Sequence, residues 1–100
     1  IKMVVKIKIP VPLQRLTRGL EEVEGIEGTI IELVNYLDEQ YPGIGERLSD
    51  NGKIRKFVNF YLNEEDIRFL NFENTEIKDG DEISIVPALS GGKNLYKLIR

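Results

Sequence analysis

The chain has 100 residues, 41% of them hydrophobic and 31% charged, with a net charge of −3, as expected for one small globular domain. It contains no cysteine and no histidine, which removes thiol nucleophiles, imidazole bases and the usual zinc ligands. The acidic balance disfavours nucleic acid, and we find no membrane-spanning run or export signal, so we expect a cytoplasmic protein without nucleic-acid or membrane partners.

The first residues predict a β-hairpin. Residues 3–9 alternate between aliphatic side chains and lysine-bearing positions, as in a strand with one buried face, and Pro10 ends the strand. Residues 14–19 are typical of a polar turn, and residues 20–23 predict a second, short strand. The side chains expected to face the core from these two strands are Met3, Val5, Ile7, Ile9, Leu20 and Val23.

Residues 28–43 predict the main helix. Thr29 with Glu32 three positions later forms the pattern of a capping box at the helix start. Pro42 followed by Gly43 ends the helix. The apolar stripe expected along it consists of Ile30, Leu33, Val34, Leu37 and Tyr41. The following segment, up to residue 53, is predicted to be irregular with one short helical turn.

The second half predicts three further strands. Residues 56–63 are rich in aromatic and β-branched side chains, which favour a strand. Residues 63–66 are predicted as a turn, residues 67–69 as a short strand that pairs back, and residues 72–80 as a loop. Residues 81–89 predict the last strand. The side chains expected to face inward are Val58, Phe60, Leu62, Ile83 and Ile85.

The predicted order is therefore β-β-α-β-β-β, an α+β domain in which one helix covers one face of a sheet. The first and last strands carry similar apolar faces, so we expect them to pair at the centre of the sheet. If they run parallel, the crossover through the helix should be right-handed.

Three strings with this order and spacing resemble the ubiquitin-like sulfur-carrier family of the ThiS/MoaD type. The strings are "GTIIELVNYL" (28–37), "FVNFYLNEEDIRFL" (57–70) and "IKDGDEISIVPALSGG" (77–92). The resemblance implies an α+β, ubiquitin-like β-grasp fold: a mixed sheet of four to five strands with one main helix packed on one face. It also implies a carrier domain over residues 1–92 and a C-terminal extension over 93–100. The "RKFVNFYLNEEDIRF" string most resembles the carriers that supply sulfur for cysteine biosynthesis.

The resemblance further implies that the chain is a substrate of other enzymes rather than an enzyme, with no bound cofactor. In this family an E1-like activating enzyme of the ThiF/MoeB type uses ATP to adenylate the carboxylate of the last glycine. A sulfur donor then forms a thiocarboxylate, and a partner synthase accepts the sulfur. Carried over to this sequence, the acyl site is Gly92, and Ser90 and Gly91 form the segment that threads into the partner. Glycine lacks Cβ, so backbone can approach backbone closely there.

Two acidic motifs contain the residue types of a metal site or of a catalytic carboxylate pair. Residues 79–82 combine acids with Gly80 as calcium loops do, but the remaining ligand positions are missing, so we expect a turn and no metal site. Residues 64–66 are interpreted as a solvated hairpin tip.

The outward face of the sheet is a candidate partner surface. If Val58 and Phe60 point inward, then Phe57, Tyr61 and Val86 lie on the open face, and we add Leu89 to this surface. An exposed apolar patch of this kind usually marks a binding site for a partner. The alternative is that a loop covers these side chains.

The eight residues after Gly92 depart from the family pattern, because most carriers end at Gly-Gly. We expect a JAMM-type zinc peptidase to remove residues 93–100. Alternatively, Leu95, Leu98 and Ile99 form an amphipathic turn of the fold, or the residues are an expression artefact. If the extension is permanent, the chain is a non-catalytic β-grasp interaction module. A further alternative is the small subunit of a molybdopterin-synthase-type complex.

Overall fold

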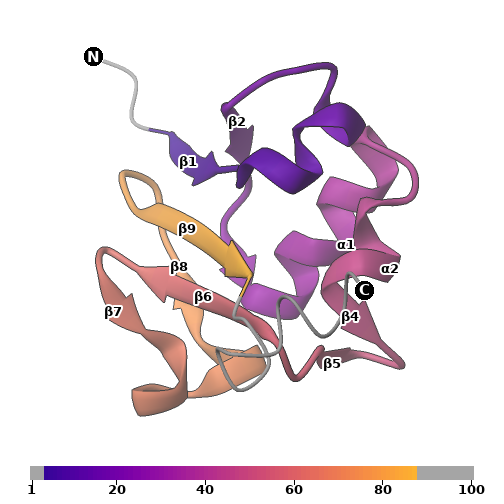
Figure 1. Cartoon of the computed structure of the whole chain (residues 1–100). Coiled ribbons are helices and arrows are strands. Elements are labelled where there is room, and N and C mark those ends of the chain that lie inside the picture. Colours follow the sequence, from indigo (N-terminus) through magenta and orange to yellow (C-terminus); the bar gives the residue numbers. More distant parts are fainter. Residues whose placement is uncertain (1–3, 88–100) are drawn as a thin grey trace.

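The computed structural model describes residues 4–87, and the predictions on Met3 and on every residue after Pro87 lie outside this range (Figure 1). Five strands form the main sheet in the spatial order β2-β1-β9-β6-β7. Their bounds are β1 Val5–Lys8, β2 Glu22–Gly25, β6 Val58–Leu62, β7 Glu65–Asp66 and β9 Glu82–Pro87. Two small sheets pair β3 (Gly28–Thr29) with β8 (Glu76–Ile77), and β4 (Ser49–Asp50) with β5 (Lys53–Ile54).

The centre of the sheet confirms the predicted pairing of the first and last strands. β1 runs parallel to β9, with Ile7 opposite Ile83, while β6 pairs antiparallel with the other side of β9. The helices are α1 (Ile30–Gln40), α2 (Ile44–Leu48) and three 3-10 helices: η1 Val11–Thr17, η2 Ile67–Phe69 and η3 Phe72–Asn74. The α+β fold with a mixed five-stranded sheet and one main helix is confirmed. Among the described residues no helix is long and apolar enough to cross a bilayer.

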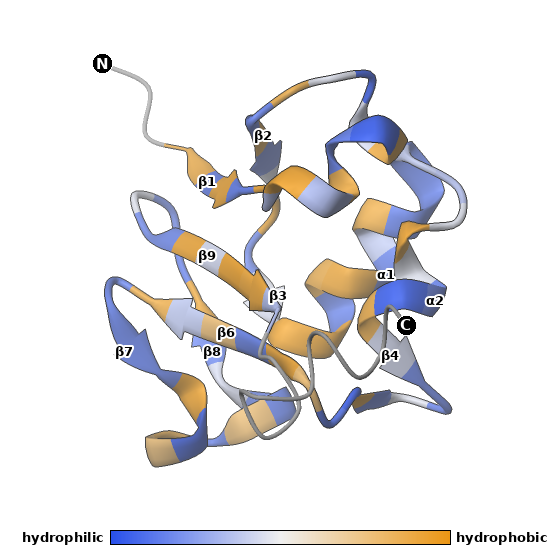
Figure 2. Cartoon of the chain, viewed as in Figure 1, coloured by the Kyte–Doolittle hydropathy of each residue, from blue (hydrophilic) through white to orange (hydrophobic). Residues whose placement is uncertain are grey.

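The core lies between the sheet and α1, and it follows the predicted faces. In β1, Val5 and Ile7 are buried while Lys6 and Lys8 are exposed. Figure 2 shows the corresponding alternation of hydrophobic and hydrophilic residues along the ribbon. The apolar side chains with no measurable exposure are Ile7, Ile30, Leu33, Val34, Leu37, Ile44, Leu48 and Ile83. The helix stripe predicted from the sequence is therefore confirmed, with Tyr41 half-buried at its end.

Helix α1 begins with the predicted capping box. The Thr29 hydroxyl oxygen accepts the Glu32 N–H at 3.2 Å, and the Glu32 carboxylate accepts the Thr29 N–H at 2.9 Å. Two of the N–H groups that have no partner within the helix are satisfied in this way. The helix is shorter than the predicted 28–43, because residues 28–29 pair with β8 instead. Gly43, with a φ of 102°, precedes α2, the short helical turn expected in residues 43–53.

The predicted strand at 67–69 is wrong, because the hairpin turn is tighter than expected. Asn63 and Glu64 both have positive φ, 49° and 75°, which is the backbone of a two-residue hairpin turn. Glu65 and Asp66 are therefore already in the returning strand, opposite Leu62 and Tyr61. The Asp66 carboxylate then accepts the Arg68 N–H at 2.9 Å and starts η2 at the position where the strand was predicted.

The predicted second strand is shifted by two residues. Residues 11–17 form η1 rather than only a polar turn, and the strand runs from Glu22 to Gly25 instead of 20–23. The buried Thr17 hydroxyl donates to the Leu20 carbonyl oxygen at 2.8 Å, which keeps Leu20 in the loop. Leu20 is 45% exposed rather than in the core, whereas Val23 is buried as predicted.

The Asp66–Arg68 pair on β7 and η2 gives a pH-dependent prediction. The side-chain hydrogen bonds from Arg68, with Nη2 2.7 Å from Oδ2, hold the pKa of the Asp66 carboxyl below its usual value. A carboxyl whose pKa is lower when folded stabilises the fold above its unfolded pKa, and this contribution is lost as pH falls through the folded pKa. Arg68→Gln should therefore melt at a lower temperature than the wild type at neutral pH, with the difference shrinking below about pH 4. Thermal unfolding across this pH range tests it, and an unchanged difference would contradict the assignment.

Candidate functional site

The candidate site is the end of β9, where the chain leaves the sheet toward the glycine pair. Val58 of β6 lies opposite Pro87, the last residue of β9. Gly92 is five residues farther along the chain. Ser90, Gly91 and Gly92 lie outside the described residues, so the structure defines the place from which they start.

The turn before β9 holds the strand in register. The Asp81 carboxylate accepts the Lys78 N–H at 2.8 Å, and Gly80, with a φ of 92°, donates its N–H to the Val4 carbonyl oxygen at 3.1 Å. Residues 79–81 thus form the predicted turn, and Glu82 already begins β9. Within the described part of the chain, no group of three or more acidic side chains is arranged to hold a metal ion.

Asn63 is a positioning residue whose role the sequence did not reveal. Its side-chain amide donates to the Asp81 carboxylate at 2.9 Å, and its side-chain oxygen accepts the Glu82 N–H at 2.9 Å. Its own N–H donates to the Glu82 carbonyl oxygen at 2.8 Å. The β6–β7 turn is therefore attached directly to the start of β9. An asparagine at a positive φ directly after a strand is the signal that could have indicated this role.

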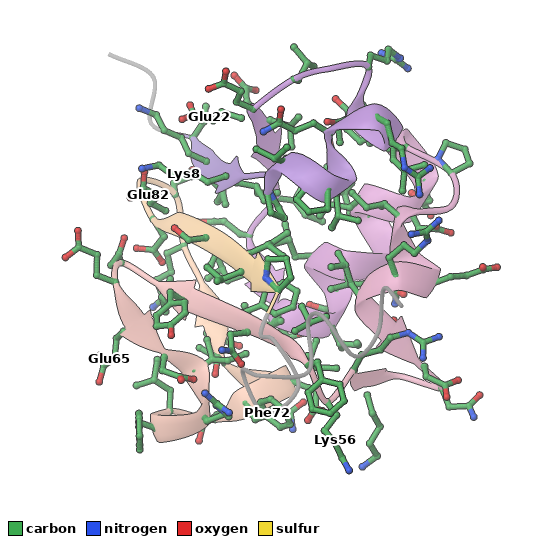
Figure 3. All side chains as sticks on the ribbon, viewed as in Figure 1. Lys8, Glu22, Lys56, Glu65, Phe72 and Glu82 are labelled. Atoms are coloured by element: carbon green, nitrogen blue, oxygen red, sulfur yellow. The ribbon has the colours of Figure 1, made fainter. Side chains whose placement is uncertain are left out.

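The open face of the sheet carries charges over β2 and β1. In register, Lys6 lies between Glu24 and Glu82, and Lys8 lies opposite Glu22. The Lys8 ammonium is 3.2 Å from the Glu82 carboxylate, and Figure 3 shows Lys8 with Glu22 and Glu82 at this end of the strands. This part of the face is a set of alternating charges rather than an apolar surface.

The apolar part of the open face lies at the opposite end, next to Pro87. Phe57 is 48% exposed and Val86 is 42% exposed, while Tyr61 is half-buried. No described loop covers Phe57 or Val86. Leu89, the fourth residue predicted for this surface, lies outside the described residues. The structure therefore places three of the predicted residues on β9 or on the neighbouring β6 and the residue before it.

The end of β9 also borders an apolar groove of about 170 Å³. It is lined by Pro12, Leu13, Arg47, Leu48, Val58, Ile85 and Pro87. A larger, polar cleft of about 500 Å³ lies beside α1, α2 and the β4–β5 hairpin. In that cleft the Asp38 carboxylate accepts the N–H groups of Gly43 and Gly45 at 3.0 and 2.9 Å. Asp38 therefore has a structural role, because it holds the connection between α1 and α2. For this reason we place the candidate site at the end of β9 rather than in this polar cleft.

Comparison with known proteins finds similar carrier proteins. The chain is 41% identical over 93 residues to the sulfur carrier protein CysO of Mycobacterium tuberculosis, covering 90% of this chain and 100% of that protein. The crystal structure of that CysO superposes with a TM-score of 0.79 at 40% identity, over 85% of this chain and 99% of the other. A chain of the BexX/CysO complex of Amycolatopsis orientalis superposes with a TM-score of 0.82 at 38% identity, over 88% of this chain and 99% of that one.

The match to a protein family includes both the folded domain and the glycine pair that follows it. The model of the ThiS family matches residues 7–92, a range that ends at Gly92. The relatives are named as carriers, which confirms the prediction of a carrier protein rather than an enzyme. The resemblance to the cysteine-biosynthesis carriers is likewise confirmed by the similarity to CysO. The chain belongs to the ThiS family.

Proposed function

We propose that this protein carries sulfur as a thiocarboxylate on Gly92, after residues 93–100 have been removed. The observation that carries the proposal is the family match over residues 7–92, which has Gly91 and Gly92 at its end. In the sequence Gly92 is followed by Lys93, so its carboxyl group is in a peptide bond until that bond is cleaved. A JAMM-type zinc peptidase is the class of enzyme that we propose for this cleavage.

The chemistry needs an activated carboxylate, because a free carboxylate is a poor acyl donor. The Gly92 carboxylate attacks the α-phosphorus of ATP in an E1-like enzyme, pyrophosphate leaves, and a mixed anhydride with AMP forms. A hydrosulfide-level donor then attacks the carbonyl carbon and AMP leaves, so that one oxygen of Gly92 is replaced by sulfur. A synthase accepts this sulfur. ATP is bound by the partner enzyme, and its use supports a cytoplasmic location.

The described structure supports this role through the position of its exposed apolar side chains. Phe57 directly precedes β6, Tyr61 lies within β6, and Val86 adjoins Pro87 in β9. We add Leu89 to the surface that a partner contacts. Aromatic side chains at the centre of an interface contribute much of its binding energy. The BexX/CysO complex of Amycolatopsis orientalis, a structure of a similar carrier with another protein, supports a protein partner of this kind.

The intact mass of the untagged protein, purified from its own host, tests the proposal. We expect chains that end at Gly92, a fraction of them heavier by the exchange of one oxygen for one sulfur. Alkylation with iodoacetamide should label only this heavier fraction, because the chain has no cysteine and the thiocarboxylate is its most reactive sulfur nucleophile. Chains that always retain Lys93–Arg100 would contradict removal of the extension and, with it, activation at Gly92.

A further inference from the structure

The segment between β4 and the end of β6 has a charge opposite to that of the protein as a whole. Residues 51–62 contain three cations, Lys53, Arg55 and Lys56, and no acid, in a chain of net charge −3. All three side chains are exposed. A local concentration of one sign in a protein of the other sign creates a directional field that a partner of opposite charge can follow.

No ion pair between described residues involves these cations, although Asp50 lies opposite Lys53 in the β4–β5 hairpin. The ion pairs between described residues join Lys8 to Glu82 and Arg68 to Asp66, and neither involves this segment. The Arg55 Nε–H donates to the Glu46 carbonyl oxygen at 2.6 Å, which gives that guanidinium a structural role. Lys56, with the exposed Lys53 beside it in the chain, therefore supplies most of the charge that is available to a partner.

Two exposed aromatic side chains lie in the same region. Phe57 follows Lys56 directly and is 48% exposed, and Phe72 of η3 is 37% exposed. The Glu73 carboxylate accepts the Ile54 N–H at 3.1 Å, which attaches η3 to the segment that carries the lysines. Figure 3 shows Phe72 and Lys56 on the same side of the molecule, near the start of β6.

Phe72 adopts an unfavourable backbone conformation, with a φ of 49°. A bulky residue rarely has a positive φ, and such strain persists only where the surroundings impose it. Here the Thr75 N–H donates to the Phe72 carbonyl oxygen at 3.0 Å, and the buried Thr75 hydroxyl accepts the Asn71 N–H at 3.0 Å. Strain of this kind is concentrated at functional sites, which is a reason, independent of the charge, to assign Phe72 to a binding surface.

The position of this segment determines which partner meets it. Val58, two residues after Lys56, lies opposite Pro87. Gly92 is five residues beyond Pro87, and an extended chain of that length reaches no more than about 18 Å. An enzyme that holds Gly92 in its active site must therefore cover the end of β9, and its surface there comes close to Lys56 and Phe57.

We propose that Lys53, Lys56, Phe57 and Phe72 form a docking surface, the basic–aromatic surface, for an acidic patch of the enzyme that adenylates Gly92. On the enzyme, this acidic patch would have an apolar depression that receives the aromatic rings, and carboxylates around the depression that pair with the lysines. This assignment depends on the proposed function, because it takes the activating enzyme as the partner. The lysines accelerate encounter and the rings slow dissociation, as is usual for charged rims and aromatic centres.

A matched pair of charge reversals tests the surface. Lys56→Glu is compared with Lys78→Glu, which makes the same charge change in the turn before β9, at the other end of that strand from Pro87. Both are made in the chain that ends at Gly92, which retains all described elements, and circular dichroism checks the fold of each. Association with the host's own ThiF-type activating enzyme is followed by stopped flow at low and high salt.

We expect Lys56→Glu to lower the association rate about 3- to 10-fold at low ionic strength and Lys78→Glu to change it less than about 2-fold. The difference should disappear near 1 M salt, where the screening length is about 3 Å. Phe57→Ser should raise the dissociation rate. Equal effects of the two charge reversals would overturn the surface assignment. If the unaltered chain ending at Gly92 is not adenylated at all, the proposed function fails instead, so the two failures are distinguishable.

Discussion

Gly91→Val, in the chain that ends at Gly92, is expected to reduce adenylation by about 100-fold, the loss that a displacement of about 1 Å can cause. The reason is steric. Valine places a β-branched side chain beside the reacting carboxylate, in a segment that must pass close to the backbone of the partner enzyme. The rate is measured as ATP–pyrophosphate exchange with the activating enzyme.

A control variant separates this effect from general damage to the tail. Ala88→Val introduces the same side chain three residues earlier, next to Pro87, and should adenylate at nearly the wild-type rate. A binding measurement without ATP should show that Gly91→Val still associates through the folded domain. If Gly91→Val exchanges pyrophosphate as fast as the unaltered chain, Gly91 is not in a narrow channel and its assignment to the threading segment is wrong.

Phe60→Ala should lower the free energy of unfolding by about 3–5 kcal/mol, as for other aromatic truncations in a packed core. Phe60 lies in the middle of β6, opposite Ile85, and is 1% exposed. The loss is large against the total of about 5–15 kcal/mol that is typical of small domains. Urea unfolding followed by circular dichroism measures it, and the smaller truncation Phe60→Leu keeps the test possible if Phe60→Ala does not fold.

Phe69→Ala is the matched control, since it removes the same ring from a side chain that is 81% exposed. Its effect should lie within about 0.5 kcal/mol of zero, as is usual for surface substitutions. A Phe60→Ala loss no larger than the Phe69→Ala loss would mean that β6 does not pack on the core in the register described. Because β6 pairs with β9 along its whole length, that result would also remove the basis for placing Phe57 beside Pro87.

Much of the fold could be predicted from the sequence, because the patterns involved are local. Alternation in residues 3–9 and in the two strands of the second half distinguishes buried from exposed side chains through the period of two of a strand. The Thr29–Glu32 capping box marks the start of α1 within one residue. The strings that resemble the sulfur carriers could also be recognised from local sequence, because the turn that starts at residue 79 and the aliphatic strand after it are contiguous in the chain.

The errors arose where a side chain makes a bond that local patterns do not reveal. The two positive φ values at Asn63 and Glu64 shorten the hairpin turn, and the Asp66 carboxylate then caps a 3-10 turn in place of the predicted strand. Likewise, the Thr17 hydroxyl retains Leu20 in a loop. In both places the competing hydrogen bond, rather than hydrophobic alternation, decides the backbone conformation.

The sequence by itself determined the family, the strand and helix patterns, and Gly92 as the residue where chemistry is expected. Only the tertiary structure decided which surface surrounds the exit to that residue. The pairing of Val58 with Pro87 brings Lys56 and Phe57 to the end of β9, although about 30 residues separate them in the chain. The physical reason is that strand register depends on contacts between segments distant in sequence, and no local periodicity contains that information.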